Sequence, residues 1–65
     1  MVINDKKYEI ALANSGLSAG ETAIRAGISR QRLNVVLNSK RITPKTAGKI
    51  ARALGVDVTE IIETE

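Results

Sequence analysis

The chain has 65 residues without histidine or cysteine, so it forms one domain (1–65) with a thin core and lacks the usual metal ligands, general base and thiol nucleophile. No enzymatic activity, metal or cofactor is therefore expected, and the absence of cysteine and of long apolar runs predicts a cytoplasmic protein with no membrane partner. The net charge is only +3, and the single aromatic residue argues against single-stranded nucleic acid, whose binding relies on aromatic stacking.

The first predicted helix covers about 5–15. Asp5 is a candidate N-cap, because its carboxylate can accept a hydrogen bond from a free amide of the first turn. Spacings of three and four place several residues on the inner face, and a glycine ends the helix: Tyr8, Ala11, Leu12, Ser15 and Gly16. Strand signals are poor throughout the chain.

The second and third helices are predicted from capping residues. Ser18 and Glu21 have capping-box spacing and open a helix that Gly27 closes. Ser29 is the next N-cap and begins a helix over about 30–38. The inward stripe of this third helix consists of Leu33, Val36 and Leu37.

Two more helices are predicted toward the end of the chain. Thr43 followed by Pro44 predicts a helix with Thr43 as its N-cap and proline at its first position. Gly55 is expected to end this helix. Asp57 and Glu60 repeat the capping-box spacing and predict a short last helix. The two apolar faces consist of Ala47, Ile50, Ala51 and Leu54, and of Val58, Ile61 and Ile62.

The segment 18–38 has the spacing of a helix-turn-helix. Gly27 allows a turn with positive φ, and the next helix begins after Ser29. Arg30 and Arg32 lie in the first turn of that helix, where the helix dipole favours an anion, so a negative partner is expected there. The exposed face collects side chains suited to base edges: Arg30, Gln31, Asn34, Val35 and Asn38. Val35 either contacts a thymine methyl group or pads the edge of the core.

The basic residues are concentrated in the middle of the chain. From Thr22 through Val56 there are eight Lys or Arg and no Asp or Glu, and all seven acidic residues lie outside this stretch. This pattern is typical of a surface that binds a polyanion, the alternative being a basic face that only aids solubility.

An ordered set of short motifs runs from Leu17 to Ile62. The set comprises Gly16-Leu17-Ser18, Ala26-Gly27-Ile28-Ser29, Lys40-Arg41, Thr43-Pro44, Ile50-Ala51-Arg52-Ala53-Leu54-Gly55-Val56 and Ile61-Ile62. In this set the chain resembles the Cro and lambda-repressor-like (XRE-type) helix-turn-helix family. The resemblance implies an all-α, five-helix domain that binds double-stranded DNA sequence-specifically as a transcriptional regulator, with repression as the expected role.

The resemblance also assigns roles to residues. Base contacts are expected from Arg30, Gln31, Asn34 and Val35, and contacts to the DNA backbone from Ser29, Arg32, Asn38, Lys40, Arg41, Thr43 and Lys45. Lys49 and Arg52 either extend these contacts or form only a solvated face of the fourth helix. A homodimer is expected, because one short helix reads few base pairs.

Some positions depart from the family pattern. Ala19 stands where many members have a glutamine that braces the recognition helix, so that bracing must be missing or replaced. Gly20 and Thr22 are expected to weaken the second helix. Leu37 and Ser39 replace a frequent acidic residue and a frequent glycine, which predicts a different exit from the third helix.

Two questions about partners stay open from the sequence. The last helix could supply a dimer interface through Val58, Ile61 and Ile62, or these residues could be buried in the core. The alternative function is a helix-turn-helix protein-interaction module, anti-repressor or antitoxin-like, that binds a second regulator or a toxin. The polar face of the third helix favours DNA, because an interaction module would expose apolar or acidic residues there.

Overall fold

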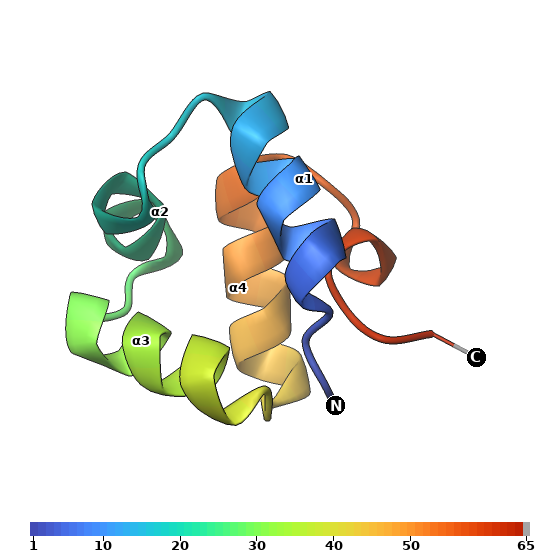
Figure 1. Cartoon of the computed structure of the whole chain (residues 1–65). Helices are drawn as coiled ribbons and strands as arrows, with labels where there is room; N and C mark the ends of the chain where they lie inside the picture. Colours follow the sequence, from blue (N-terminus) through green and yellow to red (C-terminus); the bar gives the residue numbers. More distant parts are fainter. Residues whose placement is uncertain (65) are drawn as a thin grey trace.

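Four α-helices form the fold in a computed structural model that describes residues 1–64 (Figure 1). The elements are α1 (Asp5–Ser15), α2 (Ala19–Ala26), α3 (Arg30–Ser39), α4 (Pro44–Leu54) and the 3₁₀ turn η1 (Val58–Glu60). α4 lies behind α1, α3 crosses below them, and α2 packs at one side (Figure 1). The all-helical helix-turn-helix arrangement is confirmed.

The prediction of a fifth α-helix is wrong, because this segment forms only the three-residue 3₁₀ turn η1. Asp57 caps this turn, but it accepts from the Thr59 amide at 3.1 Å, so the capping is more local than the expected pairing with Glu60. Ile61 and Ile62 then leave the turn and are buried in the core. Burial therefore explains the apolar character of Ile61 and Ile62, which was the second of the two alternatives that the sequence left open.

The predicted caps of α2, α3 and α4 are confirmed. Ser18 Oγ accepts from the Glu21 amide at 3.1 Å, and Glu21 Oε1 accepts from the Ser18 amide at 2.8 Å, which completes the capping box. Hydrogen bonding of the Glu21 carboxylate by the backbone amide and the side chain of Ser18 lowers the pKa of this carboxyl, with a smaller contribution from the charge of Arg25. Ser29 and Thr43 cap the next two helices through the amides three residues further on.

Ser18→Ala tests how much this cap contributes. We expect the free energy of unfolding to fall by about 1 kcal/mol, because one amide of α2 loses its partner. Ser18→Gly should cost only a few tenths of a kcal/mol, since glycine is tolerated as an N-cap. Urea denaturation followed by circular dichroism measures both, and an alanine variant as stable as the wild type would contradict the capping role.

The predicted cap of α1 is wrong by one residue. Asn4 is the N-cap, and its side-chain oxygen accepts from the Lys7 amide at 2.9 Å. Asp5 is the first helical residue, and its carboxylate pairs with the Lys40 ammonium at 2.7 Å. The acidic side chain is thus used in a contact between α1 and the end of α3.

The N-terminal residues form a short pairing that the poor strand signals did not predict. The segment 1–4 lies between 40–42 and 61–63, through isolated antiparallel bridges of Val2 with Arg41 and of Ile3 with Ile62. The Ile3 amide donates to the Lys40 carbonyl at 2.8 Å, and the Asn4 amide donates to the Ile61 carbonyl at 2.8 Å. The start of the chain therefore ties the loop after α3 to the end of the described chain.

The core contains the inner faces of all four helices and of these paired segments. Its buried members are Ile3, Tyr8, Ala11, Ala23, Ala26, Leu33, Val36, Ile42, Ala47, Ile50, Ala51, Leu54, Ile61 and Ile62. Thr22 is also fully buried, and its hydroxyl donates to the Ser18 carbonyl at 2.9 Å. Since this polar group is satisfied, α2 stays regular over Ala19–Ala26, and the expected weakening does not disrupt it.

Candidate nucleic-acid interface

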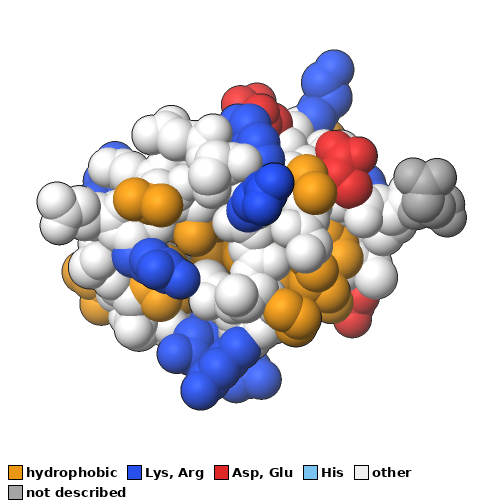
Figure 2. Space-filling model, turned by 90° about the horizontal axis from the view of Figure 1, so that it is seen from below, with side chains coloured by type: hydrophobic (Ala, Val, Ile, Leu, Met, Phe, Trp, Pro, Cys, Tyr) orange, Lys and Arg blue, Asp and Glu red, His pale blue; other side chains and the backbone are white. Residues whose placement is uncertain are grey.

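The exposed face of α3 presents the side chains predicted to read bases. Leu33 and Val36 are buried and fix the helix on the core, while Arg30, Gln31, Asn34, Val35 and Asn38 are all exposed. The first turn of α3 holds no acidic residue. Figure 2, which views the molecule from the α3 side, shows Lys and Arg side chains spread over this face, with Asp and Glu only toward its upper and right-hand margins.

Arg30 is held in place by its neighbours. Its Nε donates to Asn34 Oδ1 at 3.3 Å, one turn along the same helix. Its Nη1 lies 3.7 Å from the position that a Cβ on Gly20 would occupy, so the guanidinium lies beside the first turn of α2. Ala19 offers no polar side chain to Arg30, whose hydrogen bond to Asn34 lies within α3.

Tyr8 lies behind this arrangement in the core. Its side chain is 5% exposed, and among the described residues its hydroxyl has no hydrogen-bond partner. Burial raises the pKa of the Tyr8 hydroxyl, and the positive charge of Arg30 opposes that rise in part. The Tyr8 hydroxyl thus stays neutral at physiological pH.

Val35 is exposed on α3, with 56% of its surface accessible. It therefore does not pad the core. An apolar side chain is thereby placed beside Gln31 and Asn34 on the same outer face, as contact with a thymine methyl group requires.

The residues predicted to contact the DNA backbone differ in how free their side chains are. Arg32, Asn38, Arg41 and Lys45 are exposed, whereas the hydroxyls of Ser29 and Thr43 accept the amides of Arg32 and Thr46 as helix caps. Lys40 is only half-exposed: its ammonium pairs with Asp5 and donates to the Leu37 carbonyl at 2.8 Å.

The exit from α3 is formed by a residue other than glycine. Lys40 takes the left-handed C-cap position with φ 66°, where glycine is usual, and its amide donates to the Val36 carbonyl. The two contacts of its ammonium hold the side chain in this conformation. The loop that leads to Thr43 thus starts from a fixed point.

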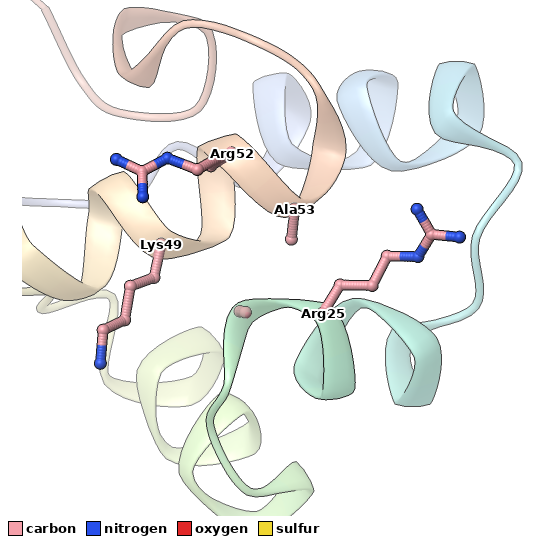
Figure 3. Close-up of a pocket in the computed structure, with 5 residues that line it drawn as sticks. Arg25, Lys49, Arg52 and Ala53 are labelled. Carbon is pink, nitrogen blue, oxygen red and sulfur yellow. The ribbon is translucent and has the colours of Figure 1, made fainter.

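Two contributions to this surface were missed from the sequence. Tyr8 behind Arg30 and Asp5 against Lys40 come from α1, far along the chain from α3. No local pattern could identify them, because both contacts depend on how α1 packs. Lys49 and Arg52 of α4 line a hollow between α2 and α4 (Figure 3).

Within residues 1–64, no helix combines the length and apolar character needed to cross a membrane. Within the same residues, no cluster of three or more Asp or Glu side chains is arranged to hold a metal ion.

Comparison with known proteins supports the interpretation of the fold as a helix-turn-helix domain. A helix-turn-helix family model matches residues 9–61, which include α1 from its second turn onward, the whole of α2, α3 and α4, and η1. Searches of curated proteins and of solved structures gave no significant match.

Proposed function

Because the chain belongs to the Cro/C1-type (XRE-like) helix-turn-helix family, a family of DNA-binding regulators, we propose that it is a sequence-specific repressor that inserts α3 into the major groove of double-stranded DNA. The observation that carries this proposal is the exposed face of α3, where Arg30, Gln31 and Asn34 stand together without an acidic residue. These three side chains are the types that form paired hydrogen bonds with base edges.

Arg30 and Asn34 act as a unit in this proposal. Because Arg30 Nε donates to Asn34, the two Nη groups of the guanidinium remain to donate to guanine O6 and N7. Holding the guanidinium in advance lowers the entropy that is lost on binding. Gln31 then reads a neighbouring adenine, and Val35 contacts a thymine methyl group.

Contacts to phosphate supply most of the affinity. Arg32, Asn38, Arg41 and Lys45 are exposed around α3 and at the start of α4, where they would flank the groove. Lys40, Ser29 and Thr43 contribute by position, because they fix the ends of α3 and α4 and the loop between them. Such contacts bind any sequence and fix the register of α3 on the duplex.

A homodimer on DNA is part of the proposal. One recognition helix of ten residues spans few base pairs, and paired half-sites one helical turn apart would supply the remaining selectivity. Analytical ultracentrifugation of the protein with a two-site duplex and with a one-site duplex tests this, since a dimer requires two protomers on the two-site duplex.

Selection from a pool of random duplexes, followed by anisotropy titration over a series of salt concentrations, tests the function. We expect an enriched motif that contains guanine, and a slope of log affinity against log salt of about −5 to −6, as for five to seven neutralised phosphates. If no duplex binds even at low salt, the DNA proposal falls and the module that binds a protein regulator or toxin takes its place.

Asn34→Ala tests the pairing with Arg30. We expect affinity for the selected site to fall at least about tenfold, as for loss of one hydrogen bond to a charged group, with the preference for guanine relaxed at one position. Asn38→Ala is the matched control, because it removes the same side chain from the same face without touching Arg30. Equal effects of both variants on that guanine position would contradict the pairing.

A further inference from the structure

A basic groove lies along the junction between α2 and α4, and no residue of α3 lines it. The groove has a volume of about 370 Å³ and is formed by Arg25 and Ala26 of α2 and by Lys49, Arg52 and Ala53 of α4. Figure 3 shows Ala53 directed into the space between the helices, with Arg25 extending to one side of the hollow and Lys49 and Arg52 to the other. Ala26 is buried and Ala53 half-buried, so the groove has an apolar floor and a cationic rim.

The charges of the rim are not neutralised by the groove itself. No acidic residue lines it, and the one ion pair among the described residues joins Lys40 to Asp5. Glu21 lies one turn before Arg25 on α2, but its carboxylate is held by Ser18 and feels Arg25 only weakly. A ligand in the groove would therefore meet three cations whose charges are free to interact with it.

Helix-terminal electrostatics explain only part of this arrangement. Arg25 and Arg52 lie in the last turns of α2 and α4, where a cation interacts favourably with the helix dipole. Lys49 lies mid-helix, three residues before Arg52, and like charges at neighbouring helical positions repel. The helix dipole therefore accounts for the placement of Arg25 and Arg52, and it does not account for Lys49 beside Arg52.

The shape and chemistry of the groove select its occupant. Its volume is near the lower end of the range for ligand pockets, which suits a short segment rather than a broad surface. The rim suits carboxylates, and the alanine floor suits an aliphatic side chain. The contacts proposed for duplex DNA lie on α3 and the start of α4, outside this groove.

We propose that the groove between α2 and α4 binds an acidic segment of a partner protein, one that carries carboxylates on both sides of an aliphatic residue. Because no residue of α3 lines the groove, the segment and DNA can be bound at the same time. The proposal does not depend on which DNA sequence α3 reads.

Titration of the ¹⁵N-labelled protein with acetyl-Glu-Asp-Leu-Glu-Asp-amide tests the proposal, with acetyl-Gln-Asn-Leu-Gln-Asn-amide as the uncharged control. We expect the acidic peptide alone to shift the amide signals of Arg25, Ala26, Lys49, Arg52 and Ala53, and to bind less tightly as salt rises. No shifts in the groove, or equal shifts at Arg30, Arg32 and Arg41, would overturn the proposal.

Matched variants separate the groove from general basic charge. Lys49→Gln should weaken peptide binding about two- to fourfold, as for loss of one exposed ion pair, while Lys6→Gln on α1 should leave it unchanged. Both variants should bind duplex DNA within twofold of the wild type. If Lys49→Gln weakens duplex binding as much as peptide binding, the groove belongs to the DNA footprint and the proposed protein partner is wrong.

Discussion

Replacing Arg30, Gln31 and Asn34 together by alanine is expected to weaken binding to the selected duplex at least about 30-fold, since each of two lost paired contacts contributes about 1–3 kcal/mol. Weak binding to a scrambled duplex should survive, because Arg32, Arg41 and the other cations still contact phosphate. Anisotropy titration of both duplexes at one fixed salt concentration measures the ratio of the two affinities.

All three replaced side chains are exposed, so the fold is expected to persist. Circular dichroism and the melting temperature check this. Lys6→Ala/Asn14→Ala, which truncates two exposed side chains of α1, is the control and should keep wild-type selectivity. A triple variant that still prefers the selected duplex as strongly as the wild type would show that α3 does not read the site.

Ile3→Ala is expected to lower the free energy of unfolding by about 2–4 kcal/mol, as for truncation of a large aliphatic side chain in a core. Ile3 is 1% exposed and lies between the loop after α3 and the end of the described chain. A domain of this size is stabilised by only about 3–10 kcal/mol in total, so the variant should be close to unfolding. Urea denaturation of both proteins measures the difference.

Val2→Ala is the matched control for Ile3→Ala. Val2 belongs to the same paired segment, but its side chain is 47% exposed, so its truncation should cost about 0.5 kcal/mol or less. If the two variants lost equal stability, the effect would come from the backbone pairing rather than from burial of Ile3. A stable Ile3→Ala protein would contradict the place of the N-terminus in the core.

The features predicted correctly from the sequence are local. Ser18, Ser29 and Thr43 each accept an amide three residues ahead, so a cap is determined within a single turn of the chain. The same holds for the inner faces of the helices, which follow from spacings of three and four. These local rules sufficed to find the helix-turn-helix and its exposed face.

The incorrect predictions concern positions whose conformation depends on contacts with residues far away in the sequence. Asn4 and Asp5 are both good caps, and Lys40 decides between them because it pairs with Asp5. The last helix is only a 3₁₀ turn, since Ile61 and Ile62 continue into the core beside Ile3.

The arrangement around Arg30 was only half predictable for the same reason. Its place on the exposed face follows from helical periodicity, and its hydrogen bond to Asn34 follows from a spacing of four residues. The positions of Gly20 and Tyr8 beside it depend on how α1 and α2 pack against α3. Helical spacing alone contains no information on that packing.

The most direct test of the central claim is a ¹⁵N–¹H titration of the protein with the selected duplex, which identifies the residues that contact DNA. The account predicts that the largest shifts fall on residues 29–35 and on the loop and helix start at 40–45, with small shifts on the outer face of α1. Shifts confined to α1 or to the groove between α2 and α4, with α3 unaffected, would contradict it.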